Sequence, residues 1–324
     1  MKIREYSDIH LDWYFAGGKD FDVLGEIVCW YPPELPDDKE TILILAGDLW
    51  TGTRFIEWAG YSWIGIVAQR FQQVLIVLGN HDYWPQGNLS IVKGADKCNA
   101  MLQDMCLFNV HVLDQSTYAI DDYLFVGATL WTDMDKGNPL TMMSMSQFMA
   151  YDGKIKYDVG GKDGNEYRRF TSELWVALHR KHKKYIANIA ELNRDKKLVV
   201  ITHHLPLAQM GDPMYEGNES NGYYYSDLSD LILDNENIVF WCCGHSHCSN
   251  DFMFGKTRMY MNPVGYAGEH REQEELVKHE VIELSSLLSE LPCSDRPDAP
   301  HGFNRNASHD AHRYVCDCEG WSPE

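Results

Sequence analysis

Short apolar runs with a strand-like composition alternate with longer stretches of helical periodicity along this chain of 324 residues. The runs are Thr41 to Ala46, Gln73 to Leu78, Tyr123 to Ala128, Leu198 to Thr202 and Ile238 to Cys242. Met1 to Glu5 also predicts a strand at the start of the chain. Strands that alternate with helices predict a layered α/β fold.

The clearest helical pattern covers Glu173 to Asn193, with Thr171 or Ser172 as the N-cap. Its expected buried stripe consists of Leu174, Leu178, Tyr185, Ile189 and Leu192. The opposite face is basic and carries His179, Arg180, Lys181, His182, Lys183 and Lys184. A charge run opposite an apolar stripe is usually a solvated face, although this one could also meet a phosphate group.

Composition and charge exclude several classes of protein. Apolar residues make up 44% and charged residues 23% of the chain, which excludes a collagen-like or largely disordered protein. No apolar run reaches the roughly 18 residues of a membrane-spanning helix, and the N-terminus lacks the apolar core of a signal peptide, so we expect a cytoplasmic protein without membrane contact. The formal net charge of −20 disfavours tight binding to duplex DNA. Cysteines 242, 243 and 248 lie in or near an apolar run, which predicts reduced core thiols.

We expect one domain over residues 1–285 and an extended tail over residues 286–324. The segment from Met134 to Ser172 is interrupted by glycines and is predicted to be a long, partly irregular insertion. The tail is rich in proline and poor in apolar residues. It contains four soft metal ligands, which form either a small zinc site or part of an exposed coil: His309, His312, Cys316 and Cys318.

Residue types that bind metals follow several of the strand-like runs. The segments are Asp8-Ile9-His10, Gly47-Asp48, Gly79-Asn80-His81-Asp82, His203-His204 and Gly244-His245-Ser246-His247. Strand ends in an α/β sheet lie along one edge, so ligands from distant positions in the sequence converge there. Oxygen and imidazole ligands without thiolate suit manganese, iron or zinc ions that keep open positions. The glycines before Asp48, Asn80 and His245 are expected to permit sharp turns.

In residue type and order, these loops resemble the calcineurin-like metallophosphoesterase superfamily. The resemblance spans residues 1 to about 284, and the stretches Tyr225 to Leu228 and Asn262 to Tyr266 resemble one bacterial and phage branch. It implies a four-layer αββα sandwich, in which two mixed β-sheets lie between helices. It also implies a dimetal site at the C-terminal edge of the strands.

Carried over position by position, the resemblance implies two divalent ions per chain, with manganese favoured for activity. One ion would be held by Asp8, His10, Asp48 and His247. The other would be held by Asp48, Asn80, His203 and His245, so that Asp48 bridges the two ions. A hydroxide between the ions would attack phosphorus. His81 would protonate the leaving oxygen or stabilise its charge.

The chain departs from the family pattern beside the catalytic histidine. Many relatives carry a carboxylate three residues after the bridging aspartate, where it orients the histidine, and Thr51 stands there in this chain. Asp82 could orient His81 instead, or it could cap and close the loop. The arginine-bearing motif of protein Ser/Thr phosphatases is missing after Gly47, which disfavours a phosphoprotein substrate.

Further residues are candidates for substrate contacts. Trp50 and Trp84 could stack on a nucleobase or pack in the core, and His204 could touch substrate or support the ligands. The insertion is expected to cover the metal edge and to contribute to substrate choice. Tyr151 and Asp152 are its first candidates, because they resemble a short segment of the same branch.

The leading functional hypothesis is a dimetal phosphoesterase that hydrolyses a phosphomonoester or phosphodiester, on a phosphorylated small molecule that resembles a nucleotide. A nuclease of the DNA-repair type is the enzymatic alternative, favoured by the basic helix and disfavoured by the net charge. A scaffold that binds without catalysis is the third hypothesis. Oligomeric state is left open by the sequence.

Overall fold

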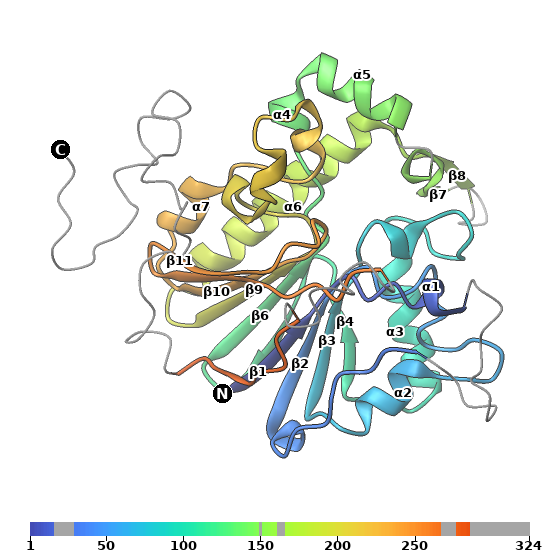
Figure 1. The fold of residues 1–324 in the computed structure, drawn as a ribbon, viewed down its shortest axis with the longest axis vertical. Coiled ribbons are helices and arrows are strands. Elements are labelled where there is room, and N and C mark those ends of the chain that lie inside the picture. Colours follow the sequence, from blue (N-terminus) through green and yellow to red (C-terminus); the bar gives the residue numbers. More distant parts are fainter. Residues whose placement is uncertain (16–28, 149–150, 161–165, 267–276, 286–324) are drawn as a thin grey trace, which may run out of the picture.

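Two mixed β-sheets face each other at the centre of the protein (Figure 1). The computed structural model describes residues 1–15, 29–148, 151–160, 166–266 and 277–285. The first sheet has the strand order β13-β1-β2-β3-β4. Its strands are β1 (Lys2–Tyr6), β2 (Thr41–Ala46), β3 (Gln73–Val77), β4 (Val110–Val112) and β13 (Ile282–Glu283).

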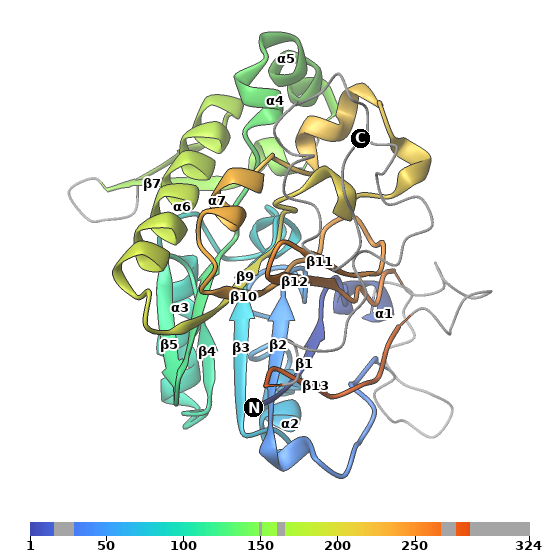
Figure 2. The same cartoon turned by 90° about the vertical axis from the view of Figure 1, so that its left-hand side faces the viewer.

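The second sheet has the strand order β11-β12-β10-β9-β6-β5. Its strands are β5 (Ser116–Ile120), β6 (Tyr123–Ala128), β9 (Lys197–Thr202), β10 (Ile238–Cys242), β11 (Asn250–Phe254) and β12 (Thr257–Met261). Strands β1 to β4 are parallel, as are β6, β9, β10 and β12. All the strands predicted from the sequence are therefore confirmed. Parallel neighbours end at the same edge, as Figure 2 shows for β2 and β3.

Helices cover the outer face of each sheet. The first sheet packs against α1 (Leu11–Phe15), α2 (Trp63–Ala68) and α3 (Gly94–Asp104), and the second against α6 (Ser172–Leu192) and α7 (Ser229–Leu233). Between the sheets lies an apolar core that includes Ile44, Leu75, Val199 and Phe240. Two further cores join each sheet to its helices. The predicted αββα sandwich is confirmed.

Helix α6 begins and ends within one residue of the predicted bounds, and its N-cap Thr171 accepts a hydrogen bond from the N–H of Leu174. The predicted apolar stripe is confirmed except at its end: Leu178 is buried, and Leu174, Tyr185 and Ile189 are partly buried against the cores, whereas Leu192 is 77% exposed. The helix buries Trp175, Val176, Leu178, His179, His182, Ile186 and Ala190. The prediction overlooked that aromatic and histidine side chains can occupy a buried face when their polar atoms find partners.

Two histidines of the predicted basic face thus lie on the buried side of α6. His182 Nδ1 accepts the N–H of Leu130 at 3.1 Å, and His179 Nδ1 lies 3.4 Å from the carbonyl oxygen of Trp131. The exposed basic residues of this part of the helix are Arg180, Lys181 and Lys184. The basic surface is therefore smaller than the sequence suggests.

The segment from Met134 to Ser172 is more regular than predicted. It contains α4 (Met134–Gly137), α5 (Pro139–Phe148), the 3-10 turn η3 (Asp152–Lys154) and a hairpin of β7 (Lys156–Gly160) and β8 (Glu166–Arg169). Gly137 and Gly160 have positive φ and end these elements, so the glycines mark turns and not an irregular course. Ile155 is fully buried in the core between the first sheet and its helices, which anchors the segment there.

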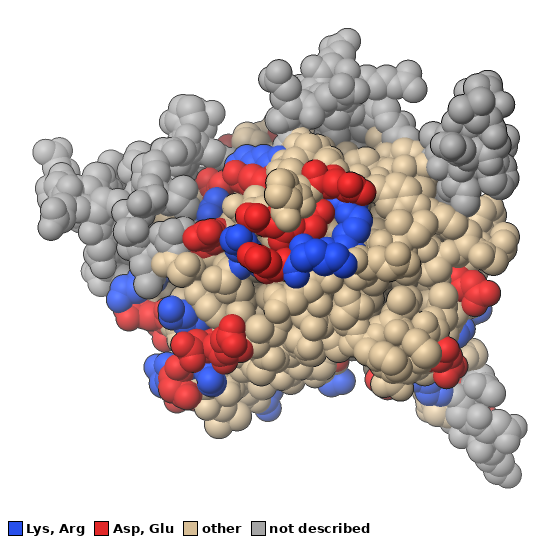
Figure 3. All heavy atoms as spheres, turned by 90° about the horizontal axis from the view of Figure 1, so that it is seen from below, with Lys and Arg blue, Asp and Glu red and all other residues tan. Residues whose placement is uncertain are grey.

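The helices, the surface charges and the cysteines can be compared with the expectations from composition. No helix within the described ranges is long and apolar enough to cross a membrane. Seen from below, Lys and Arg side chains lie among Asp and Glu on a largely uncharged face (Figure 3). Cys242 and Cys243 are buried free thiols, whereas Cys248 is half-buried. The tail, with its candidate zinc ligands, lies outside the described residues.

Candidate active site

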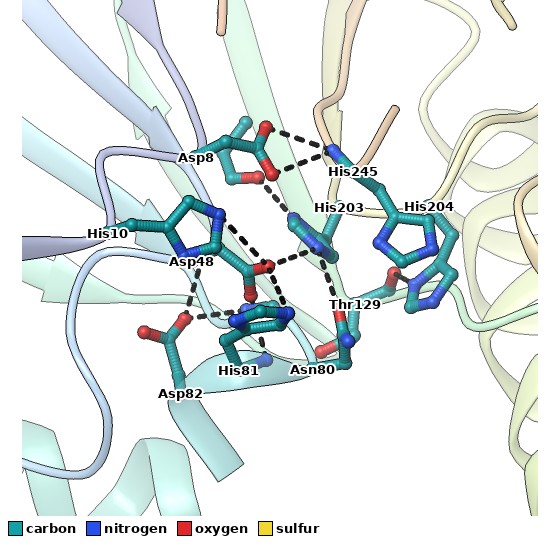
Figure 4. Close-up of polar contacts among 12 residues, drawn as sticks. Asp8, His10, Asp48, Asn80, His81, Asp82, Thr129, His203, His204 and His245 are labelled. Carbon is teal, nitrogen blue, oxygen red and sulfur yellow. Dashed lines mark hydrogen bonds and ion pairs between the residues drawn. The ribbon is translucent and has the colours of Figure 1, made fainter. Parts of the chain in front are cut away.

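Two clusters of ligand side chains lie at the edge where the strands of both sheets end (Figure 4). The first contains Asp8, His10 and His247, and the second Asp48, His203 and His245; a third group, His10, Asp48 and His81, shares one residue with each of them. Within each cluster the ligand atoms lie within 4.8 Å of one another. Each residue follows the carboxyl end of β1, β2, β9 or β10, which explains how distant positions meet.

Distances inside the clusters show one shared carboxylate. His247 Nε2 lies 3.5 Å from Asp8 Oδ1 and 3.1 Å from His10 Nε2. Asp48 Oδ2 lies 3.3 Å from His203 Nε2 and 4.0 Å from His10 Nε2. Asp48 therefore stands between the two clusters, in the position predicted for a bridging ligand. Asn80 joins the second cluster, with Oδ1 3.0 Å from His203 Nε2.

The backbone at this edge adopts left-handed conformations that are uncommon outside glycine. Positive φ angles of 48° to 74° occur at Asp8, His10, Asp48, His245 and His247. Aspartate and histidine tolerate this region better than branched residues, but each such residue costs about 1–3 kcal/mol. Strain concentrated on candidate ligands indicates that their placement serves function and not stability.

Glycines give the ligands room to approach one another. A Cβ atom on Gly79 would lie 2.1 Å from Asp48 Oδ1, and one on Gly244 would lie 2.4 Å from Asp8 Oδ2. Gly47 has a φ of 96°, and a Cβ atom there would lie only 2.3 Å from His203 Nδ1. The predicted need for sharp turns holds at Gly47, whereas Gly79 and Gly244 are required for close approach.

Burial and mutual charge set the protonation of the site. The pKa of His10 falls to about 3, because burial disfavours the charged imidazole. Burial also lowers the pKa of His203, but the Asp48 carboxylate outweighs it and raises that pKa to about 9. Burial raises the pKa of Asp48, and His203, His81 and His10 together hold it well below its usual range. The site thus contains an ionised carboxylate beside neutral and cationic imidazoles.

This donor set fits divalent cations. Among the described residues, His245 Nε2 is buried without a hydrogen-bond partner. Burial holds the pKa of His245 well below its usual range, so its ring is the neutral form that binds metals. A cation in the second cluster could replace the proton of His203 as the charge opposite Asp48. Carboxylate, amide and imidazole donors suit manganese, iron or zinc.

His81 lies beside both clusters. Its backbone N–H donates to Asp48 Oδ1 at 2.9 Å, and its imidazole Nε2 lies 3.9 Å from Asp48 Oδ2. Its ring stacks on Trp84 with a centroid distance of 3.6 Å and meets the edge of His10 at 4.6 Å. This position suits a group that acts on a bond next to the metals.

Asp82 closes the loops and does not orient His81. Its carboxylate accepts hydrogen bonds of 2.7 to 3.1 Å from the backbone N–H groups of Asp48, Leu49, Trp50 and Gly79. It is fully buried and joins the loop after β2 to the loop after β3. Of the two roles considered for this residue, loop closure is the one that the structure supports.

Comparisons with known proteins agree with this geometry. The model of the calcineurin-like phosphoesterase family matches residues 1–249. The chain belongs to this family. An uncharacterized protein of Acanthamoeba polyphaga mimivirus is 25% identical to this phosphoesterase over 300 residues, which cover 89% of this chain and 99% of the viral protein.

Solved structures resemble this phosphoesterase in fold. Phosphopantetheinyl hydrolase from Mycobacterium tuberculosis superposes with a TM-score of 0.56 at 18% identity, covering 84% of this chain and 92% of that one. A putative 5′-nucleotidase from Staphylococcus aureus gives a TM-score of 0.42 at 15% identity, covering 81% of this chain and 48% of that one. At 18% identity, the likeness to the phosphopantetheinyl hydrolase concerns the fold alone.

The candidate substrate residues of the phosphoesterase occupy very different environments. Trp50 is 2% exposed and packs against Trp58 at a centroid distance of 5.5 Å, so core packing is its role. Trp84 lies between His81 and Tyr151, whose ring stacks on it at 4.8 Å, so neither face of its indole is open to a base. Tyr151 is 46% exposed and is the outer ring of this stack.

His204 and Asp152 are buried next to the ligands. His204 Nδ1 lies 3.2 Å from the carbonyl oxygen of Thr129, and its ring is 4.3 Å from that of His245. Asp152 contacts Asn80 and Trp84 from the insertion. Both residues therefore touch candidate catalytic residues directly, which places them better for supporting the site than for binding substrate.

Three aromatic residues at this edge were not predicted as site residues from the sequence. Tyr266 stacks on His10 with a centroid distance of 4.3 Å, and Trp13, 53% exposed, lies 4.8 Å from Tyr266. Tyr223 lies 5.2 Å from His245 between ring centroids. Tyr266 ends a stretch that resembles relatives, which was a usable signal, whereas nothing in the local pattern distinguishes Tyr223 from its tyrosine neighbours.

Proposed function

We propose that this phosphoesterase uses two divalent cations, manganese favoured, to hydrolyse a phosphomonoester or phosphodiester of a nucleotide-like small molecule. The observation that carries this proposal is the sharing of Asp48 between two ligand clusters, with His81 alongside. Asp8, His10, Asp48 and His247 would hold one ion. Asp48, Asn80, His203 and His245 would hold the other.

The chain's own residues then have separable roles in catalysis. When bound, two cations would lower the pKa of a water molecule and offset negative charge on the phosphoryl oxygens. His81 is placed to donate a proton to the leaving oxygen or to stabilise its charge. Its backbone N–H holds Asp48 Oδ1 at 2.9 Å, so the same residue also fixes the shared carboxylate.

Aromatic side chains support a substrate with a planar group. Trp13 and Tyr266 form an aromatic pair at the edge of the sheets, directly beside His10, where a nucleobase could stack. The insertion reaches the site through Asp152, which contacts Asn80, and this supports a contribution to substrate choice. No specific observation favours the nuclease, since the basic face of α6 is smaller than predicted. None favours the scaffold, since every candidate ligand position is filled.

We also infer a domain over residues 1–285, because β13 pairs with β1 at the edge of the first sheet. The free thiols of Cys242 and Cys243 support a reducing, cytoplasmic location.

A substrate panel with a metal titration tests the proposed function. Purified protein with added Mn²⁺ should bind two ions per chain and cleave at least one of a generic monoester, a generic diester, a cyclic nucleotide and a dinucleotide. Single-stranded and duplex DNA serve as the nuclease arm. Binding of one ion, or preference for DNA over every small ester, would contradict the proposal.

A further inference from the structure

The carboxylate of Asp152 joins three segments that are distant in sequence. It lies in η3 of the insertion and is buried. Asp152 Oδ1 accepts the indole N–H of Trp84 at 2.7 Å. The amide of Asn80 donates to the two carboxylate oxygens at 3.3 and 3.5 Å. The hydroxyl of Tyr223 donates to Oδ2.

Contact with Asp152 decides which end of the Asn80 amide faces the metal site. An ionised carboxylate only accepts hydrogen bonds, so it takes the NH₂ end of the amide. The carbonyl oxygen is thereby turned towards His203 Nε2, at 3.0 Å. Only that oxygen can bind a cation. Asp152 therefore holds Asn80 in its ligand orientation.

Asp152 acts on His81 through Trp84. The indole of Trp84 stacks on the imidazole at 3.6 Å with an interplanar angle of 26°. Its N–H is bound by Asp152, and Tyr151 covers its other face. No hydrogen-bond partner of His81 Nδ1 occurs among the described residues. The imidazole is thus packed against an aromatic face, and no carboxylate holds its Nδ1 among the described residues.

We propose that Asp152 is a positioning residue that sets the amide of Asn80 and, through Trp84, the ring of His81. Thr51 stands where many relatives carry the carboxylate that orients the histidine, and Asp82 is occupied by backbone N–H groups. The insertion then supplies the missing support from another part of the chain. This inference rests on the proposed metal and acid roles of Asn80 and His81.

Calorimetric titration with Mn²⁺, without substrate, tests the effect on Asn80. Asp152→Ala should weaken binding of the ion held by Asn80, Asp48, His203 and His245 about 10- to 100-fold. This is the usual cost of losing a group that supports a metal ligand. Asp152→Asn should retain most of the affinity, because its carbonyl oxygen can still accept from Trp84 and Asn80 while its amide donates to Tyr223.

A matched control separates positioning from damage to the insertion. Asp158 is a buried aspartate on β7 of the same segment and pairs with Lys93 at 3.7 Å. Asp158→Ala should leave Mn²⁺ affinity within about twofold of the wild type. Equal losses in the two alanine variants, or unchanged affinity in Asp152→Ala, would overturn the assignment for Asn80.

Leaving-group dependence tests the effect on His81. Trp84→Leu removes the stacking face and should lower kcat for an alkyl phosphate by up to about 10²-fold, with a smaller loss for a 4-nitrophenyl ester and little change in KM. Trp84→Phe keeps a ring face and should lose less. Equal losses on both esters with a raised KM would assign Trp84 to substrate binding instead.

These measurements also distinguish the two proposals. A wild-type protein that binds two Mn²⁺ ions but cleaves no ester contradicts the proposed function, while the titration of Asp152→Ala still decides the positioning of Asn80. A wild-type protein that binds no Mn²⁺ overturns both.

Discussion

The layer between the two sheets and the edge where their strands end are built on the same strands, yet they differ in residue type and in backbone conformation. Between the sheets, Ile44, Leu75 and Phe240 are buried apolar side chains in regular strands. At the edge, equally buried positions hold aspartates and histidines with left-handed backbone. Burial in the first region stabilises the fold, whereas burial in the second carries a cost of desolvation and strain.

The difference shows that the residues at the edge lower the stability of the fold, whereas those between the sheets raise it. Buried carboxylates and imidazoles persist at the edge only because the sheets on both sides over-determine the loops. The backbone N–H of His245 donates to Asp8 Oδ2 at 2.9 Å, and the backbone N–H of Asp8 donates to the Gly47 carbonyl at 2.9 Å, so these bonds hold the strained residues together. Replacement of edge residues should therefore affect activity first, and replacement of layer residues should affect folding first.

The largest contrast is expected within β2 and the loop that follows it. Asp48→Asn should abolish hydrolysis, because it removes the shared ligand, and should leave the thermal midpoint of the apoprotein unchanged or higher. Ile44→Ala should instead lower the free energy of unfolding by about 2–5 kcal/mol and keep turnover below its melting temperature. Denaturant titration and turnover of both variants check this pair. Normal turnover in Asp48→Asn would place the chemistry elsewhere.

A second prediction tests close approach at the edge. In Gly79→Ala the new Cβ would meet Asp48 Oδ1 at 2.1 Å and His203 Cε1 at 2.7 Å. Both candidate ligands must shift, so binding of at least one Mn²⁺ ion and nearly all activity should be lost. Gly211→Ala, where the nearest atom lies at 3.2 Å and outside the site, is the control for a methyl group alone. Two tightly bound ions in Gly79→Ala would show that the edge is less crowded than described.

His81→Ala should separate metal binding from proton transfer within the edge. The variant should keep two Mn²⁺ ions and lose about 10²- to 10⁴-fold in kcat, the range for removal of a general acid. Steady-state kinetics on esters of graded leaving groups provide the measurement. The loss should shrink for 4-nitrophenolate; if it does not, charge stabilisation is the better account of His81.

The smallest expected effect is on the pH dependence of stability and concerns His182, a buried histidine of α6 that is not a candidate ligand. Burial, with Lys181 and His179 nearby, lowers the pKa of His182 to about 3. The unfolded chain has the ordinary pKa of about 6.5, so it binds more protons between these values, and stability falls as pH drops from 6.5 towards 3. Asp114, 3.6 Å from His182 Nε2, has its pKa raised to about 6, chiefly by burial, and contributes in the opposite direction.

His182→Asn keeps an acceptor for the Leu130 N–H but cannot titrate. Relative to this variant, the wild type should lose about 1.4 kcal/mol of unfolding free energy per pH unit within that window. Asp114 is present in both proteins, which removes most of its contribution from the difference. Denaturant unfolding at pH 7, 6 and 5 measures it. Parallel curves for the two proteins would mean that His182 is not held neutral.

Much of the fold could be predicted because its signals are local. The apolar runs of β2, β6 and β10 begin and end where the pattern predicts, and α6 is capped at Thr171. The buried face of α6 could be predicted only in part, since Trp175, His179 and His182 make polar contacts that their spacing does not reveal. The order within the insertion was equally hidden, because Ile155 is buried in a core formed by segments that are distant in sequence.

By itself, the sequence determined the family, the order of the strands along the chain and the ligand types that gather at one edge. It could do so because parallel strands end together whatever the connections between them. Only the tertiary structure decided which groups hold those ligands in place: Asp82 on backbone N–H groups, Trp84 against His81, and Asp152 on the amide of Asn80. These contacts depend on the direction of hydrogen bonds and ring planes across long sequence separations, and no local pattern encodes that direction.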